Sequence, residues 1–232
     1  MARDVIIACD FSNRIEFLEF LSKFNKRKLF VKVGLELFCS EGPDIVLRAK
    51  SMENKVFLDL KLHDIPNTVE KAARKISEFG VDMVTVHAAG GREMISAAKK
   101  GLSFRKNSTL LLAVTVLTSI SQEILTKELL INNTLDEVVK NYALDARESG
   151  ADGVICSPLE AAEIKRVCGR DFLAVSPGIR YESANDDQVR VSTPKQAREL
   201  GSDFIVVGRP ITNSRDPVGQ YDKIIKDFLG KM

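Results

Sequence analysis

The sequence predicts an α/β fold, a (β/α)8 barrel (TIM barrel) made of one domain over residues 1–232. Short apolar runs rich in β-branched residues recur along the chain, and helical patterns fill most of the gaps between them. Continuous runs of this kind are typical of parallel strands covered on both faces. Eight runs in 232 residues leave 29 residues per unit, which suits a βα repeat, since about 250 residues is typical of the barrel. A doubly wound open sheet is the alternative.

The predicted strands are the eight apolar runs, taken in chain order. They cover residues 5–10, 29–34, 55–61, 83–87, 109–115, 153–156, 172–176 and 204–208. Helical signals lie between several of them: apolar residues recur at three-residue spacing over 15–21, an i, i+3, i+4 stripe covers 135–146, and Pro194 opens a helix over 195–200. No Pro/Gly/Ser-rich linker or charge block divides the chain. The longest irregular polar stretch, 181–192, is expected to act as a lid.

Composition is that of an ordinary globular protein, with 44% hydrophobic and 28% charged residues. A net charge of +2 gives no case for a nucleic-acid or membrane partner. The four cysteines are scattered, the start of the sequence lacks a signal-peptide pattern, and the apolar stretches are too short to span a bilayer. We therefore expect a cytoplasmic protein. Two histidines in the chain exclude a three-histidine zinc centre.

The most informative stretch is 57–68, FLDLKLHDIPNT, where a hydrophobic strand gives way to a helix. Side chains alternate between the two faces of a strand, so Asp59 and Lys61 point one way and the neighbouring leucines the other. Charges on an apolar strand are costly to bury unless they are paired. Catalysis is the leading candidate for what compensates that cost.

Further polar residues fall at the ends of other predicted strands, and in a barrel these ends meet at the carboxyl-terminal mouth where active sites lie. Lys32 interrupts an apolar run, although a lysine there could also extend to solvent at the rim. Asp10 and Asp64 are candidates for the site, and each would also serve as a helix-capping residue. His87 has a structural as well as a catalytic interpretation.

Together, Lys32, Asp59, Lys61 and Asp64 form an expected array of two cations and two anions. Neighbouring carboxylates keep each lysine protonated, and a protonated lysine is a poor Schiff-base nucleophile. Two ammonium groups also repel a divalent ion, so a metal site is disfavoured. The remaining chemistry is electrostatic stabilisation of a developing carbanion and proton donation to it.

A second cluster has the character of an anion site. The segments 176–180 and 207–210 follow the seventh and eighth predicted strands, which are the usual phosphate positions of such barrels. Gly178 and Gly208 let backbone N–H groups approach an oxyanion, a helix start adds its positive end, and Arg209 supplies a planar fork of donors. The two segments together predict that a phosphate binds here.

The segment 59–68, DLKLHDIPNT, resembles the D-x-K-x-x-D-I-P-x-T signature of the orotidine 5'-phosphate decarboxylase family. The resemblance continues through 8–10, 31–34, 114–119, 177–180, 187–188 and 206–211, so it covers most of the chain in family order. It implies that the chain is a carboxy-lyase that converts orotidine 5'-phosphate to UMP, the last step of de novo pyrimidine nucleotide biosynthesis. It also implies that the reaction uses no metal and no organic cofactor.

The resemblance assigns roles to individual residues. Lys61 would protonate C6 of the pyrimidine after CO₂ leaves, Asp59 would destabilise the substrate carboxylate, and Lys32 would complete the charge network and reach the ribose. Asp64 and Thr68 would reach across the interface of an obligate homodimer into the partner's site. The implied catalytic set is Lys61, Asp59, Lys32 and Asp64. The implied substrate-binding set is Asp10, Lys32, Thr68, Thr118, Ser119, Pro177, Arg180, Gln188, Gly208 and Arg209.

Two other functions remain open at this point. A metal-dependent phosphosugar decarboxylase or aldolase of the same superfamily would share the D-x-K-x-x-D core, but is expected to carry an acidic metal ligand at the second strand end, where this chain has Lys32. A non-catalytic nucleotide-binding barrel would need the phosphate segments, but it has no use for a buried array of lysines and aspartates.

Overall fold

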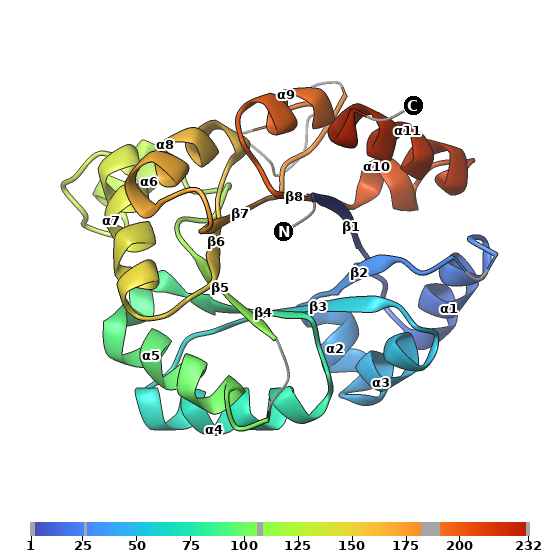
Figure 1. The fold of residues 1–232 in the computed structure, drawn as a ribbon, viewed down its shortest axis with the longest axis horizontal. Helices are drawn as coiled ribbons and strands as arrows, with labels where there is room; N and C mark the ends of the chain where they lie inside the picture. The colour runs from blue at the N-terminus through green and yellow to red at the C-terminus, as the bar shows by residue number, and fades with distance from the viewer. Residues whose placement is uncertain (1–2, 26, 106–108, 182–190, 231–232) are drawn as a thin grey trace.

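A closed barrel of eight parallel strands, paired in sequence order, forms the centre of the molecule. This computed structural model describes residues 3–25, 27–105, 109–181 and 191–230. The helices lie outside the ring of strands (Figure 1). Strand β8 pairs with β1 and closes the ring. The predicted (β/α)8 barrel is therefore confirmed, and the open doubly wound sheet is excluded.

All eight predicted strands are present, with ends that differ by at most two residues from those predicted. They are β1 (Asp4–Ala8), β2 (Phe30–Val33), β3 (Lys55–Leu62), β4 (Met83–His87), β5 (Leu110–Val114), β6 (Gly153–Ile155), β7 (Leu173–Ser176) and β8 (Phe204–Val207). The helices are α1 (Arg14–Ser22), α2 (Leu35–Glu41), α3 (Asp44–Ser51), α4 (Pro66–Glu78), α5 (Gly91–Leu102), α6 (Gln122–Lys127), α7 (Leu135–Glu148), α8 (Pro158–Cys168), α9 (Pro194–Glu199), α10 (Arg209–Thr212) and α11 (Pro217–Leu229), with a 3₁₀ turn η1 (Ala88–Gly90) after β4.

Local sequence signals explain where several helices begin. The hydroxyls of Thr134, Ser157 and Thr193 cap α7, α8 and α9, each within a reciprocal capping box that closes three residues later. Proline in the first turn of α8 and α9 suits the helix start because proline has no N–H to satisfy there. The predicted helix that opens at Pro194 is confirmed as α9.

The barrel has two apolar layers with different members. One cluster fills the interior of the barrel and includes Ile6, Phe30, Phe57, Met83 and Phe204. The other lies between the strands and the surrounding helices. Because side chains alternate along a strand, the next inward position after each interior residue lies one level closer to the mouth. On β2 and β3 these upper positions carry the charged residues Lys32 and Asp59, and Asp10 follows the end of β1.

A repeated contact, here named the strand-start clamp, joins neighbouring strands at the end of the barrel away from the mouth. In each clamp an aspartate precedes an even-numbered strand, accepts a hydrogen bond from the backbone N–H of the strand before it, and pairs with a lysine near the end of a helix. The three clamps are Lys50–Asp82–Val56, Lys99–Asp152–Leu111 and Lys165–Asp203–Ala174.

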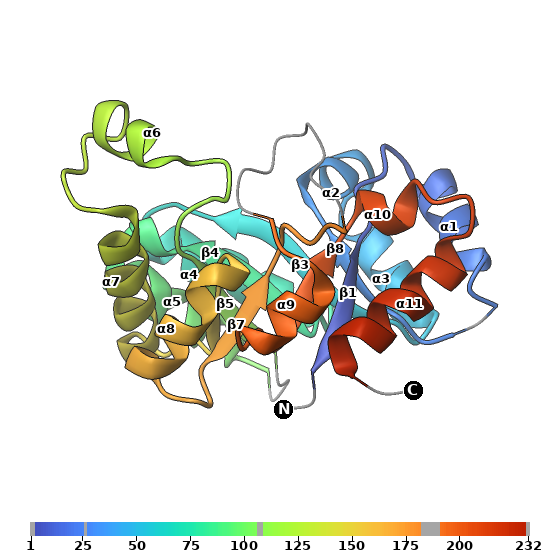
Figure 2. The same ribbon diagram turned by 90° about the horizontal axis from the view of Figure 1, so that it is seen from above.

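The long connections lie at the opposite end, around the mouth. Figure 2 shows α6 standing beyond the rim on this side, while β1 begins and α11 ends on the other side. Within the described part of the chain, no helix is long and apolar enough to cross a membrane.

Candidate active site

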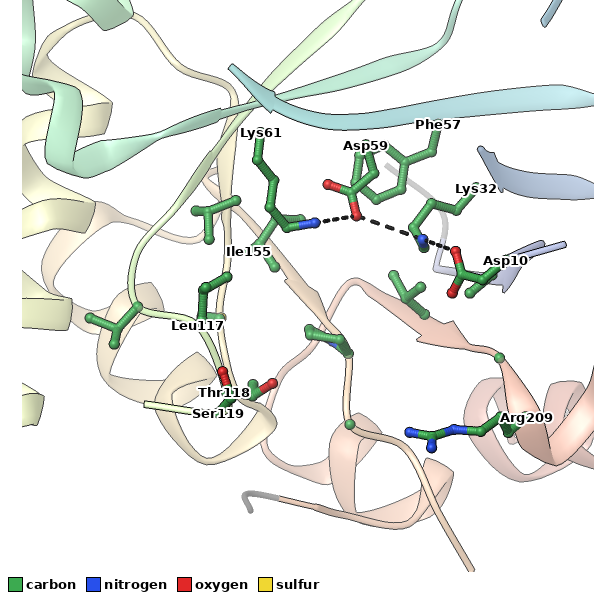
Figure 3. A pocket seen from close by; sticks show the side chains of 18 of the residues that line it. Asp10, Lys32, Phe57, Asp59, Lys61, Leu117, Thr118, Ser119, Ile155 and Arg209 are labelled. Carbon is green, nitrogen blue, oxygen red and sulfur yellow. Dashed lines mark hydrogen bonds and ion pairs between the residues drawn. The ribbon is translucent and has the colours of Figure 1, made fainter. Parts of the chain in front are cut away.

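A cavity of about 310 Å³ opens at the carboxyl ends of the strands. Its lining includes ten of the thirteen residues predicted for the site, which come from segments far apart in the sequence (Figure 3). They are Asp10, Lys32, Asp59, Lys61, Thr118, Ser119, Pro177, Arg180, Gly208 and Arg209. The mouth of the barrel therefore gathers the predicted charged cluster and the predicted anion cluster around one space.

Four alternating charges form a continuous chain along one wall of the cavity. The Lys61 Nζ lies 2.8 Å from Asp59 Oδ2, and the Lys32 Nζ lies 3.7 Å from the same oxygen. The Lys32 Nζ also lies 2.7 Å from Asp10 Oδ1. The dashed lines in Figure 3 trace this array, which we call the charge array and define as Asp10, Lys32, Asp59 and Lys61. Asp59 is its central anion, because it contacts both ammonium groups.

Burial makes the pairing within the array necessary. The side chains of Lys32 and Asp59 are only 11% and 10% exposed, and an isolated charge at that depth would carry a large desolvation cost. Burial opposes the charge of Lys32, but the carboxylates of Asp10 and Asp59 outweigh it and raise the pKa of Lys32 above its ordinary value. Lys32 is therefore protonated at neutral pH and is unsuited to Schiff-base chemistry.

Strand alternation brings these side chains into the barrel. Phe30 and Phe57 belong to the interior cluster, so Lys32 and Asp59, two residues further along their strands, point inward at the next level. Leu58, in contrast, packs toward the helices. This arrangement confirms that the charged residues of β3 and the neighbouring leucine lie on opposite faces of the strand.

Strand β3 is irregular at the site. Leu58 pairs with Val84 and Leu62 with Val86, so four steps along β3 match only two along β4. Lys61 lies within this irregularity with φ +51°, in the left-handed region that L-residues seldom adopt. A conformation of this kind costs on the order of 1–3 kcal/mol and persists only where the surroundings hold it.

Gly34 provides room for the Asp10–Lys32 pair. A Cβ atom at this position would lie 2.8 Å from Asp10 Oδ1 and 3.0 Å from Lys32 Nζ. A larger residue would therefore require the carboxylate of Asp10 or the ammonium group of Lys32 to shift. The absence of a side chain at Gly34 is therefore one of the conditions for the observed contact between Asp10 and Lys32.

The predicted anion segments line the same cavity. Gly178 has φ +76°, a backbone conformation that glycine adopts without strain. The N–H of Arg180 donates to the Ser192 carbonyl at 3.0 Å, and the N–H of Ser192 donates to the Gly178 carbonyl at 3.0 Å, which fixes the loop base. Arg209 follows Gly208 at the start of α10, and its guanidinium points toward the cavity in Figure 3.

Two predicted site residues that the structure describes, Asp64 and Thr68, do not line the cavity. The Asp64 side chain is exposed, and its Oδ1 accepts a hydrogen bond from the N–H of Ile65 at 2.7 Å. Thr68 is exposed on the first turn of α4. Within one chain, the fourth charged residue of the array is therefore Asp10, beside Lys32, and not Asp64 as the sequence suggested. Gln188 and most of the expected lid, 182–190, lie outside the described residues.

Sequence reasoning missed one polar residue that contacts the charge array. Thr85, on β4, is fully buried, and its hydroxyl donates to Asp59 Oδ1 at 2.8 Å. Its position two residues after the interior residue Met83 was the available signal. The sequence also did not identify the apolar part of the lining, which includes Ala8, Val114 and Val206.

The donor chemistry of the cavity does not suit a metal ion. Asp59 already contacts two ammonium groups and a hydroxyl, and these cations would repel a divalent ion at the same oxygens. Over residues 3–25, 27–105, 109–181 and 191–230, no group of three or more His, Cys, Asp or Glu side chains is arranged to hold a metal.

Comparisons with known proteins agree on one family. The family model described as Orotidine 5'-phosphate decarboxylase / HUMPS family matches residues 3–224. The orotidine 5'-phosphate decarboxylase of Bacillus cytotoxicus is 49% identical over 235 residues, covering 99% of each chain. The solved structure of orotidine 5'-phosphate decarboxylase from Lactobacillus acidophilus aligns with a TM-score of 0.86 at 44% identity, over 97% of this chain and 99% of that one. An uncharacterized conserved protein from Geobacillus kaustophilus aligns equally well, at 46% identity over the same shares.

Proposed function

Since the chain belongs to the orotidine 5'-phosphate decarboxylase / HUMPS family, we propose that it decarboxylates orotidine 5'-phosphate to UMP in pyrimidine nucleotide biosynthesis. The observation that carries this proposal is the charge array, in which a central aspartate contacts two lysines inside a cavity that also holds an arginine and two glycine turns. Full-length similarity to named decarboxylases supports the same reaction.

The first half of the reaction uses the negative charge of Asp59. When the substrate carboxylate binds beside Asp59, two anions lie close together in a poorly solvated space, and the ground state is raised in free energy. The C6–carboxylate bond then breaks, CO₂ leaves as a neutral molecule, and the electron pair remains on C6. Because the negative charge moves away from Asp59 in this step, the repulsion falls on the way to the transition state.

The second half uses Lys61. Its ammonium group lies at the cavity wall and is held by Asp59, so it can face the developing carbanion and stabilise it by charge. A proton then passes from Nζ to C6 and gives UMP, and solvent restores the proton on the amine. Asp10 holds Lys32, and Lys32 in turn pairs with Asp59 and helps to fix its carboxylate in place. Lys32 and Asp10 also offer polar groups to the ribose.

The remaining lining residues fit the other parts of the substrate. Arg209 and the backbone at Gly208 and Gly178 suit a phosphate dianion, because a planar fork of donors and exposed N–H groups are strong ligands for it. Thr118 and Ser119 offer hydroxyls to the pyrimidine ring from the far wall. We propose that Gln188, which lies outside the described residues, contributes a further side-chain contact to the substrate.

The complete site is proposed to need two chains. Asp64 and Thr68 do not line the cavity of their own chain, and Ile65 between them is 67% exposed. An exposed isoleucine between two polar residues fits a contact with a second copy, which would carry Asp64 to the partner's charge array. The proposed assembly is therefore a homodimer with shared sites.

A decarboxylation assay with metal removed tests the proposed reaction against a metal-dependent relative. The wild-type protein in excess EDTA is expected to convert orotidine 5'-phosphate to UMP at its full rate, followed by the loss of substrate absorbance and by chromatography of UMP. Activity that disappears in EDTA and returns with Mg²⁺ would contradict the proposal.

Lys61→Ala is the matched variant for the same assay. It removes the proton donor and the cation beside the carbanion, so we expect a loss of kcat of at least about 1000-fold, combining electrostatic and proton-transfer effects. UMP binding, measured by calorimetry, should persist because the phosphate and ribose ligands are unchanged. Retained UMP binding with no turnover in the wild-type protein would instead indicate a nucleotide-binding barrel.

A further inference from the structure

The hydroxyl of Thr85 makes two hydrogen bonds to residues of the charge array. Its Oγ1 donates to Asp59 Oδ1 at 2.8 Å and accepts from the backbone N–H of Lys61 at 2.9 Å. The amide of Lys61 can only donate, and the ionised carboxylate can only accept, so the direction of both bonds is fixed. One buried hydroxyl thus joins both members of the central ion pair.

The first bond determines how Asp59 presents its carboxylate. Oδ1 is held by Thr85, and Oδ2 remains for the ammonium groups of Lys61 and Lys32. Rotation of the carboxylate about its Cβ–Cγ bond would break the bond to Thr85. The hydroxyl therefore keeps Oδ2 directed toward the two cations and into the cavity.

The second bond holds the backbone of Lys61 in place. The backbone at Lys61 leaves the regular β3–β4 register and takes a left-handed conformation, so its N–H does not join the strand ladder. The hydroxyl of Thr85 accepts that N–H in place of a carbonyl. It thereby stabilises the strained turn that aims the lysine side chain at the cavity.

We infer that Thr85 is the positioning residue for the Asp59–Lys61 pair, acting on the rate of the chemical step without contacting the substrate. Thr85 does not line the cavity, so its effect must pass through the two residues that it holds. The inference rests on the proposed function, because it concerns the geometry of the proton donor and of the anion beside it.

Thr109 provides a matched comparison. It is also a buried threonine beside a strand, at the start of β5, and its hydroxyl donates to the Val81 carbonyl at 2.8 Å. This bond joins backbone segments far from the cavity and touches no charged group. Replacing each threonine with valine removes a buried hydroxyl at nearly constant volume, but only Thr85→Val removes one from the charge array.

The test is steady-state kinetics of decarboxylation with thermal unfolding on wild type, Thr85→Val, Thr85→Ser and Thr109→Val. Thr85→Val is expected to lower kcat about 10- to 100-fold, the range for a lost hydrogen bond to a charged group. KM should change less than about 3-fold, because the residues proposed to bind the substrate are unchanged. Thr85→Ser should restore kcat to within about 3-fold, since it keeps the hydroxyl, and Thr109→Val should lower the melting temperature but retain kcat.

Each other result overturns a specific claim. If the wild-type protein is active and Thr85→Val has the same kcat, the positioning role is wrong and the proposed function stands. The same holds if the wild-type protein is active and Thr85→Ser loses as much kcat as Thr85→Val. An inactive wild-type protein would remove the proposed function and this inference with it. If Thr85→Val fails to fold, Thr85→Cys takes its place. Its thiol is a weak hydrogen-bond partner, so a kcat between those of wild type and Lys61→Ala supports the role and a wild-type kcat contradicts it.

Discussion

His87 lies at the carboxyl end of β4, beside the charge array but not in the lining of the cavity. Its ring centroid is 5.5 Å from that of His63. Burial lowers the pKa of His87 below its ordinary value of 6.5, and the nearby His63 and Lys61 lower it further, while Asp59 opposes them. The imidazole is therefore neutral at pH 7, which favours a supporting role over acid catalysis.

A histidine NMR titration tests this environment at the scale of one residue. The chain has two histidines. The imidazole signals that disappear in His63→Gln belong to His63, and those that remain belong to His87. We expect the His87 signal to titrate with a midpoint below 6.5 and to move upward in His63→Gln, because His63 is one of the groups that lower the pKa of His87. A midpoint above 6.5 in the wild-type protein would contradict the proposed environment.

The lowered pKa of His87 makes the folded protein less stable as the pH falls. A group with a lowered pKa in the folded state binds protons more readily in the unfolded chain, so stability is full above pH 6.5 and falls as the pH drops toward the folded-state value. Replacement of His87 with glutamine should therefore make the loss of unfolding free energy between pH 7.5 and pH 5 shallower, as measured by urea unfolding.

At the scale of the element, the strand-start clamps fix neighbouring strands against each other below the active site. In the clamp of Lys99, Asp152 and Leu111, the aspartate backbone N–H donates to the Leu111 carbonyl at 2.9 Å, and its carboxylate accepts the Leu111 N–H at 2.8 Å. The lysine then pairs with the same carboxylate. Each clamp therefore joins a helix and two strands through one side chain.

Two substitutions separate the backbone contact from the ion pair. Asp152→Ala should cost about 2 kcal/mol of unfolding free energy, because it leaves the buried Leu111 N–H unsatisfied. Asp152→Asn should cost about 1 kcal/mol or less, because the amide oxygen still accepts that N–H and only a partly exposed ion pair is lost. Urea unfolding followed by circular dichroism measures both.

The control for this prediction is the exposed pair of Lys127 and Glu123 on α6. Glu123→Gln removes an exposed i, i+4 pair and should change the unfolding free energy by about 0.5 kcal/mol at most. Equal losses in Asp152→Ala and Asp152→Asn would mean that the ion pair, and not the strand contact, supplies the stability of the clamp.

At the scale of the whole molecule, the question is whether one chain completes a site. The charge array within a chain ends at Asp10 and Lys61, and Asp64 is turned to solvent. A shared site in a symmetric dimer would bring Asp64 of one chain to Lys61 of the other. Such sharing makes activity depend on the pairing of chains and not only on the sequence of each.

Mixing two inactive variants tests the shared site. Asp64→Ala and Lys61→Ala proteins should each be inactive alone, but a mixed dimer holds one site with both residues intact. After subunit exchange at equal concentrations, half of the dimers are mixed and one of their two sites is complete, so about one quarter of wild-type activity should return. The absence of recovery, with exchange demonstrated by differently tagged chains, would contradict the shared site.

Much of this architecture follows from the sequence by itself. The period of the apolar runs determined eight strands, and the alternation along each strand determined that Lys32 and Asp59 point into the barrel. The unusual combination of charges on an apolar strand also identified the charged wall of the site. These features depend on residues near each other in the chain, where period and side-chain direction are fixed by backbone geometry.

Only the tertiary structure decided how these residues meet. Thr85 lies beside Asp59 because it is one step beyond the Leu58–Val84 pair. The same hydroxyl reaches the N–H of Lys61 because β3 and β4 lose register before Leu62. Asp10 reaches Lys32 because Gly34 leaves space. Contacts of this kind join segments more than 20 residues apart, and their partners depend on strand register and on the room between backbones. A local pattern carries no record of either, so the sequence identified the charged residues and the fold determined their arrangement.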